Sequence, residues 1–403
     1  MEKKRRLLPM SVQSFEKLRE NECLYVDKTE YVYRLVHDVA HFFLSRPRRF
    51  GKSLLLSTLR AYWEGKKDLF SGLAIETLES ENQNAWQPYP VFYFDFNGRN
   101  YIDHALETLL SSYLSQWEET YGISADGKTP EERFENLLMK AYAKTGRRCV
   151  VLVDEYDKPL LDVIDHPEKL EHNKTVLKGL FSNLKNCDSY IQFVFITGVS
   201  AFHKVSIFGE LNQLRDISLS KEFSALCGIT EAELQENFAP EILRLAEEKR
   251  LSEKLCLEEL EKQYGGYKFH QDGINVYNPF SLMNAFADRE FGSYWFETGT
   301  PTFLIKRLKE LNLDPHRFTD RTLYASADVL KDYRPGNPNP LPLLYQTGYL
   351  TIAGYDEEDQ EYTLAFPNNE VRSGFLKNLI PSVCVNASVM RAEKSLEADS
   401  KRR

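Results

Sequence analysis

A Gly-Lys-Ser sequence at residues 51–53 has the residue types and the setting of a phosphate-binding loop. The apolar run 42–44 is long enough for a buried strand, a turn follows it, and residues 54–63 read as a helix. The N-terminus of a helix attracts anions through its unpaired N–H groups and its dipole. In such a loop Lys52 would reach the β- and γ-phosphates, and the Ser53 hydroxyl would ligate Mg²⁺. The segment therefore predicts a nucleotide site.

The turn before the triplet departs from the usual pattern of these loops. Arg46 stands where a glycine is expected, and the turn is basic instead of glycine-rich. An ordinary helix start with a solvated basic turn is therefore the alternative interpretation. The residues that we expect to contact the nucleotide are Arg46, Arg48, Arg49, Phe50, Gly51, Lys52, Ser53 and Leu54.

Two carboxylates follow another apolar run later in the chain. Residues 149–153 are continuously apolar, which is typical of a strand buried on both faces, and Asp154 and Glu155 come directly after them. Open α/β sheets bind ligands at the carboxyl ends of their strands. We therefore predict that Asp154 holds Mg²⁺ through water, together with Ser53, and that Glu155 polarises the attacking water as a general base. A capping aspartate at a strand-to-helix turn is the alternative.

A small polar residue, Thr197, follows the next apolar run, residues 190–196. In related ATPases such a residue senses the γ-phosphate, so we name Thr197 beside Glu155 as a candidate catalytic residue. An ordinary threonine in a turn is the alternative.

Strands alternate with helices in the first half of the chain, which predicts an α/β fold with a doubly wound, mainly parallel sheet. The predicted strands are residues 42–44, 91–96, 149–153, 190–196 and 217–219, and the predicted helices include residues 103–121, 131–145 and 167–187. We assign residues 1–229, with an N-terminal lead-in, to a P-loop ATPase domain.

Charged helices and a hairpin follow this domain. Residues 230–342 predict a helical lid region, with an irregular, proline-rich end. A helix at 343–348 and two short strands, 349–352 and 362–366, predict a winged-helix-like unit over residues 343–380. Residues 381–403 are polar and lack periodicity, so we expect them to be disordered.

Composition limits the classes of function. The 403 residues are 42% hydrophobic, enough for two or three domains, and their formal net charge is -9. That charge does not favour binding of nucleic acid or anionic lipid over the whole surface. The six cysteines are scattered, which predicts reduced thiols. The sequence has no secretory signal, and no apolar run approaches the roughly 20 residues of a membrane span. We therefore predict a cytoplasmic protein with no membrane partner.

Several short segments together resemble one family. They are YVDKT at 25–29, RPRRFGKS at 46–53, DEYDKP at 154–159, FITGVS at 195–200, YNPF at 277–280 and LYQTGYL at 344–350. The series resembles the bacterial AAA-ATPase-like family of P-loop proteins, over about residues 7–375. The resemblance implies binding of ATP and Mg²⁺, and it makes the basic loop the normal form.

Many members of that family continue into a domain similar to PD-(D/E)XK nucleases. No aspartate followed by Glu-x-Lys occurs after Phe375, so we expect either a short member or a truncated one.

Three functions remain open at this point. The first is an ATP-hydrolysing switch, which Glu155 favours. The second is a non-hydrolysing nucleotide-binding module that regulates a nuclease or nucleic-acid partner, which the missing loop glycine favours. The third is a nucleic-acid-binding scaffold, which rests on the hairpin unit and the loop arginines. Arg48 and Arg49 could act as an arginine finger within a homo-oligomer, clamp phosphates of their own site, or be surface arginines.

Overall fold

The chain divides into two compact units in a computed structural model. The model describes residues 7–123, 129–201, 207–209, 211, 213–295, 304, 308, 323–331 and 339–379. The first unit comprises Met1–Arg46 and Gly51–Ser218, and the second comprises Pro47–Phe50 and Leu219–Arg403. The loop predicted to bind phosphate is thus divided, because four of its residues belong to the second unit.

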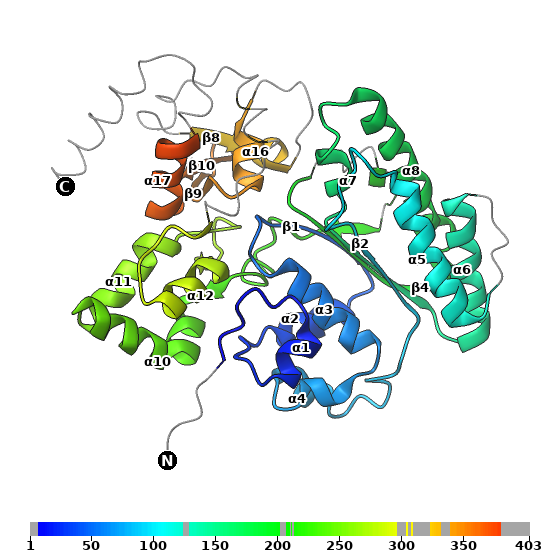
Figure 1. Ribbon diagram of the computed structural model, residues 1–403, viewed down its shortest axis with the longest axis horizontal. Coiled ribbons are helices and arrows are strands. Elements are labelled where there is room, and N and C mark those ends of the chain that lie inside the picture. The colour runs from blue at the N-terminus through cyan, green and yellow to red at the C-terminus, as the bar shows by residue number, and fades with distance from the viewer. Residues whose placement is uncertain are drawn as a thin grey trace. The chain divides into compact units, whose positions relative to one another are not determined.

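A five-stranded sheet in the order β2-β3-β4-β1-β5 forms the centre of the first unit (Figure 1). Its strands are β1 (His41–Ser45), β2 (Val91–Asp95), β3 (Cys149–Asp154), β4 (Ile191–Gly198) and β5 (Leu214–Asp216). Every neighbouring pair is parallel. All six residues of β3 are buried, as its continuous apolar sequence requires in the interior of a sheet. The predicted α/β fold with a parallel sheet is confirmed.

The fifth strand differs from the prediction. A strand was expected at residues 217–219, but β5 is Leu214–Asp216, which pairs with the first three residues of β1. The later segment turns instead, because Ser218 bonds to the end of β1: its hydroxyl accepts from the Ser45 N–H at 2.9 Å. A three-residue strand at the edge of a sheet needs no continuous apolar run, so its sequence signal is weak.

Helices cover both faces of this sheet. The helices of the first unit are α1 (Phe15–Glu20), α2 (Thr29–Val36), α3 (Lys52–Trp63), α4 (Ala74–Leu78), α5 (Leu106–Tyr121), α6 (Pro130–Thr145), α7 (Lys158–Leu161) and α8 (Pro167–Asn186), with short 3₁₀ turns η1 (Lys67–Phe70) and η2 (Asp188–Tyr190). Helix α3 packs on β2 and β3 from one face, and α6 packs on β3 from the other, beside α5 and α8 (Figure 1). Right-handed crossovers place these helices on opposite faces. The connection from β1 to β2 crosses the sheet toward one edge, whereas the connections from β2 through β3 to β4 run back in the opposite direction.

The second unit is built from helices and two small antiparallel sheets. Strand β6 (Ile229–Thr230) pairs with β7 (Val276–Tyr277), and β8 (Leu323–Ser326), β10 (Glu361–Ala365) and β9 (Thr351–Asp356) form a sheet in that order. The helices are α10 (Glu231–Lys249), α11 (Glu253–Tyr264), α12 (Pro279–Asp288), α15 (Ala327–Lys331), α16 (Leu341–Gln346) and α17 (Asn369–Gly374), followed by the π-helical turn η4 (Phe375–Leu379). The predicted hairpin is present as β9 and β10, whereas β8 was not predicted.

Two expectations fall partly or wholly outside this description. The tail at 381–403, which we expected to be disordered, lies beyond the described residues, and so does most of the proline-rich end of the predicted lid region. Among the helices that the structure does describe, none is both long and apolar enough to cross a bilayer.

Gly198, the last residue of β4, has no room for a side chain. A Cβ atom there would lie 2.7 Å from Asp157 Oδ1 and 2.7 Å from Tyr156 Cε1, both of which are buried. We expect Gly198→Ala to lower the free energy of unfolding by about 1–3 kcal/mol, measured by urea denaturation.

Gly179→Ala is the matched control, because Gly179 lies within α8 and its Cβ would come no closer than 3.4 Å to the flexible Glu131 side chain. Its helix should be unchanged or stabilised, by up to about 1 kcal/mol. Equal destabilisation by both substitutions would contradict the packing described at Gly198.

Candidate nucleotide-binding site

The Gly-Lys-Ser sequence lies at the N-terminus of α3, as predicted. Gly51 is the N-cap, with a φ of 94° that glycine adopts without strain, and the helix begins at Lys52, two residues before the expected start. Ser53 and Leu54 are half-buried in the first turn of the helix. The first N–H groups of a helix have no partner within it, so this end of α3 offers donors to an anion.

Lys52 is only 5% exposed, and its ammonium lies over its own loop. Nζ donates to the carbonyl oxygen of Arg46 at 3.0 Å. The positive charge also lowers the pKa of Asp157, although burial is the larger effect and raises it. A carbonyl is an acceptor that a phosphate could replace, so the lysine is suited to move between the two.

Arg46 is buried within the first unit, where its guanidinium bonds to backbone oxygens. Nη1 donates to Ser45 O at 2.9 Å and to Ser218 O at 2.7 Å, and the Arg46 N–H donates to Gly198 O at 3.2 Å. These contacts tie the end of β1 to the segment after β5. They give Arg46 a structural role, and its predicted contact with the nucleotide stays a prediction.

Asp154 and Thr197, which were predicted separately, are brought together by the sheet. Thr197 Oγ1 donates to Asp154 Oδ1 at 2.7 Å, and Asp154 is only 2% exposed. The Tyr93 hydroxyl lies 3.5 Å from Asp154 Oδ2. Burial, and then the charge of Asp154, raises the pKa of Tyr93, so the phenol stays protonated. The Asp154 carboxylate is therefore held at the end of β3 by a side chain on each neighbouring strand.

Glu155 occupies an unusual backbone conformation at the turn after β3. Its φ is 49°, in the left-handed region, and the residue is half-buried. The next N–H, of Tyr156, donates to Thr197 O at 3.0 Å and holds the turn in place. Such a conformation costs a non-glycine residue on the order of 1–3 kcal/mol, and residues of this kind cluster at functional sites.

Asp157 joins the ends of β3 and β4. Its buried carboxylate accepts from the N–H and the hydroxyl of Ser200 at 2.8 and 2.7 Å, and from the N–H of Val199 at 3.3 Å. Burial raises the pKa of Asp157, and the hydrogen bonds from Ser200 oppose that rise. Asp157 therefore fixes the turn that carries Glu155.

Asp95 is a carboxylate at this edge that the sequence reasoning did not single out. It ends β2 and is paired in register with Asp154. Its pKa is raised by burial and by the charge of Asp154, against the lowering effect of the bond from the Asn97 N–H. The sequence does mark Asp95, because it is an acidic residue within an apolar run. The Asn97-Gly98 pair that follows predicts a turn, and the run was therefore interpreted only as a strand that ends there.

The oxygen atoms at the carboxyl ends of the strands suit Mg²⁺, which also takes ligands from phosphate and water, better than a metal ion that only protein side chains would hold. Within the residues that the structure describes, no group of three or more histidine, cysteine or acidic side chains could hold a metal ion. Mg²⁺ is usually bound by one or two carboxylates together with phosphate oxygens and water. Asp154 and the Ser53 hydroxyl carry oxygen atoms of the kind that could hold such an ion.

The other loop residues, Arg48, Arg49 and Phe50, are described with the second unit. Arg49 has a φ of 70° and Gly51 one of 94°, while the φ of Phe50 between them is not positive. Alternation of this kind turns backbone N–H groups toward an anion. Arg48 Nε is buried and has no hydrogen-bond partner in the described part of the chain.

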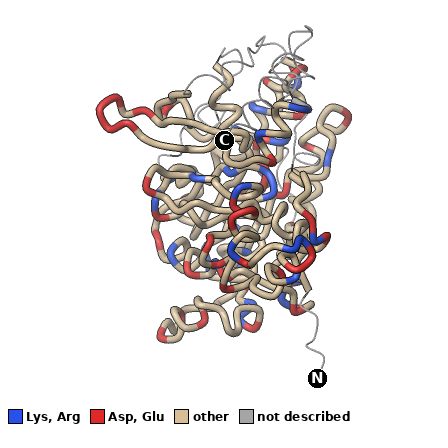
Figure 2. The backbone as a smooth tube through the Cα atoms, turned by 90° about the vertical axis from the view of Figure 1, so that its left-hand side faces the viewer, with Lys and Arg blue, Asp and Glu red and all other residues tan. Residues whose placement is uncertain are grey.

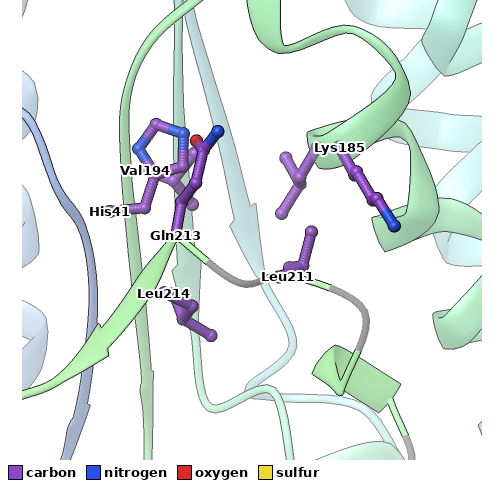
Figure 3. A pocket seen from close by; sticks show the side chains of 7 residues that line it. His41, Lys185, Val194, Leu211, Gln213 and Leu214 are labelled. Atoms are coloured by element: carbon purple, nitrogen blue, oxygen red, sulfur yellow. The ribbon is translucent and has the colours of Figure 1, made fainter.

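A cavity of about 100 Å³ lies elsewhere in the first unit (Figure 3). His41, the first residue of β1, lines it with Lys185 and Gln213. Burial lowers the pKa of His41, whereas Asp188 raises it. The cavity is at the amino end of β1, the opposite end of that strand from the Gly-Lys-Ser loop, so it is separate from the candidate nucleotide site.

This chain matches a described protein family over part of its length and a known protein over most of it. Residues 9–208 match the family described as "Predicted AAA-ATPase". A protein of Azotobacter chroococcum mcd 1, described as an uncharacterized protein in the vnfD 5′ region, is 38% identical over 394 residues. That alignment covers 96% of this chain and 72% of the relative. The chain belongs to the AAA-ATPase-like family. The AAA-ATPase-like match contains the whole of the loop and the carboxylate edge of the sheet. Membership of the AAA-ATPase-like family implies nucleotide binding.

The hydrogen bond between Thr197 and Asp154 can be tested directly. Thr197→Val keeps the shape of the side chain and removes the donor to Asp154 Oδ1. Because a buried acceptor then loses its partner, we expect the free energy of unfolding to fall by about 1–3 kcal/mol in denaturant titrations. Thr197→Ser keeps the hydroxyl and should lose less. A valine variant as stable as the serine variant would contradict this hydrogen bond.

Proposed function

We propose that this protein is a Mg²⁺-dependent ATPase whose nucleotide state acts as a switch. The observation that carries the proposal is the hydrogen bond between Thr197 and Asp154, on neighbouring strands β4 and β3. Strand β1, which leads into the Gly-Lys-Ser sequence, lies on the other side of β4. The metal-binding carboxylate and the phosphate-binding helix therefore belong to the same edge of one sheet.

In this proposal the phosphates are bound by the N-terminus of α3 and by Lys52. Lys52 exchanges the carbonyl of Arg46 for the β- and γ-phosphates. Arg48 is a further candidate, because the buried Nε without a hydrogen-bond partner among the described residues is a donor that an anion would satisfy.

Ser53 and Asp154 would hold Mg²⁺, Asp154 through water. The ion, when bound, neutralises charge on the phosphate oxygens. The Thr197 hydroxyl has one proton, and it is donated to Asp154. We therefore favour a positioning role for Thr197, with Asp154 as the group that it orients.

Glu155 is the proposed general base. It follows Asp154 directly, is half-buried, and is held in a strained turn by the contacts of Tyr156 and Asp157. A carboxylate in that place would accept the proton of the attacking water. The alternative, a nucleotide-binding module that regulates a nuclease or nucleic-acid partner without hydrolysis, differs from the proposal only in this step.

We also propose that α10 to α12 form the helical lid of residues 230–342, and that the winged-helix-like unit predicted for residues 343–380 also includes β8, which lies outside those bounds. The order strand, two helices, hairpin, with β10 between β8 and β9, supports the second assignment. A role in reading DNA is not favoured. All six residues of α16 are buried, so this helix has no free face for a groove.

The charge of the turn between β9 and β10 also disfavours DNA binding. The turn carries Asp356, Glu357, Glu358 and Asp359, all four of which are exposed; acidic residues are red in Figure 2. This charge would repel a phosphate backbone. Arg49 is the exposed loop arginine, and it remains the candidate for contact with a neighbouring subunit if the protein forms a homo-oligomer.

Lys52→Ala should abolish ATP binding, because it removes the charge that reaches the phosphates. Isothermal titration with ATP and Mg²⁺ measures this, and circular dichroism should show an unchanged fold. Lys67→Ala, an exposed lysine in η1, is the matched control and should bind as the wild type does. If Lys52→Ala bound ATP with unchanged affinity, the site would be wrongly assigned.

Glu155→Gln should keep ATP bound and slow hydrolysis by about 10²- to 10⁴-fold, because the amide keeps the size and removes the base. Phosphate release under single-turnover conditions measures the step. Equal hydrolysis by wild type and variant would exclude Glu155 as the base. A wild type that binds ATP and does not hydrolyse it would favour the regulatory module.

A further inference from the structure

Each residue of the segment Pro47–Phe50 contacts a different part of the second unit. Phe50 is 1% exposed, and its ring meets the edges of Tyr267 and Phe269, with centroids 4.7 and 5.6 Å away. The carbonyl oxygen of Phe50 accepts from the Gly228 N–H at 3.2 Å. The end of the basic turn is therefore anchored by both its side chain and its backbone.

Arg48 is held through its backbone. The indole Nε1 of Trp295 donates to Arg48 O at 3.2 Å. Trp295 is fully buried, and its ring lies edge-on to Tyr349 at 5.2 Å. An indole has a single donor, and here it is directed at a carbonyl of the loop.

Glu370 fixes Trp295 in turn. Its buried Oε1 accepts from the backbone N–H groups of Tyr294 and Trp295, the latter at 2.7 Å, and its Oε2 accepts from Ser281 Oγ at 2.8 Å. A buried carboxylate that accepts several hydrogen bonds is a rigid support. The position of the indole is therefore set by Glu370 and Ser281, and does not depend on the loop alone.

Pro47 and Arg49 have partners of their own. Gly348 has a φ of 89°, and a Cβ there would lie 2.7 Å from Pro47 Cβ, so only glycine permits this packing. The Arg49 guanidinium lies 4.6 Å from the ring centroid of Phe280, a cation–π distance. Phe280 belongs to the YNPF segment and Gly348 to LYQTGYL, two segments of the sequence that the proposed ATPase chemistry does not use.

We propose that Trp295 is a positioning residue for the phosphate-binding loop, and that Phe280 and Gly348 assist it. Arg49 holds a backbone conformation that glycine usually fills, so the loop needs outside contacts to keep its shape. The loop is joined covalently to Arg46 and Gly51, so its shape affects the nucleotide site. The second unit thereby sets nucleotide affinity, and nucleotide binding changes the surroundings of Trp295. This inference rests on the proposed function.

Trp295→Phe tests the inference, because it keeps a ring against Tyr349 and removes the donor to Arg48 O. We expect the dissociation constant for Mg-ATP, measured by isothermal titration, to rise about fivefold to tenfold, the effect of one hydrogen bond. We also expect ATP to change the tryptophan fluorescence of the wild type and not that of this variant. Trp117→Phe, a half-buried residue of α5 packed on Phe94, is the matched control and should keep both the affinity and the signal.

The outcomes separate the two proposals. A wild type that binds no ATP would overturn the proposed function and this inference with it. A wild type that binds ATP, together with a Trp295→Phe variant of equal affinity and equal fluorescence change, would overturn the inference alone.

A second pair of variants covers the case in which Trp295→Phe does not fold. Phe280→Leu removes the ring beneath Arg49, and Phe280→Tyr keeps it. We expect ATP binding to weaken about twofold to fivefold in the leucine variant and to stay near wild type in the tyrosine variant. Wild-type affinity in both would overturn the inference.

Discussion

Buried hydrogen bonds between the ends of β3 and β4 are the constraint on which the candidate site depends. Asp154 accepts from Thr197, and Asp157 accepts from Ser200 and Val199. Parallel strands bring their carboxyl ends to one edge, but they do not by themselves fix the side chains there. These bonds do, and they hold the turn that carries Glu155 in one conformation. Such rigidity is what a preorganised site for charged phosphates requires.

The basic loop adopts a left-handed backbone conformation at an arginine, where other phosphate-binding loops use glycine. A glycine-rich loop adopts left-handed conformations at no steric cost, whereas this loop places Arg49 in one. The contacts of Pro47–Phe50 with residues of the second unit offset that strain. The arrangement makes the loop dependent on sequence segments far away in the chain, which gives a physical reason for the YNPF and LYQTGYL segments.

The sequence predicted those parts of the fold that local pattern controls. The four long strands of the sheet are apolar runs, and the Gly-Lys-Ser helix follows from composition and capping. The edge strand β5 and strand β8 were missed or misplaced because short edge strands are decided by pairing and not by their own residues. The pairing of Thr197 with Asp154 could be expected from strand order, but the burial of Arg46 could not.

Other contacts could not be found from the sequence, because their partners are far apart in the chain. The bond from Trp295 to Arg48 joins residues 247 positions apart, and no local pattern predicts that they meet. Glu370 reads as a helix-start carboxylate, yet it is buried and supports Trp295. Asp95 interrupts an apolar run, but its place beside Asp154 follows only once β2 and β3 are known to be neighbours. Sequence reasoning therefore identified the candidate chemical groups and missed much of what holds them in place.

A crystal structure of the protein with Mg²⁺ and a non-hydrolysable ATP analogue would test the central claim most directly. The account predicts a triphosphate at the N-terminus of α3, with Lys52 turned from Arg46 O to the phosphates and Mg²⁺ beside Ser53 and Asp154. A nucleotide bound elsewhere, or a Lys52 that still bonds to Arg46 O with the nucleotide in place, would contradict it.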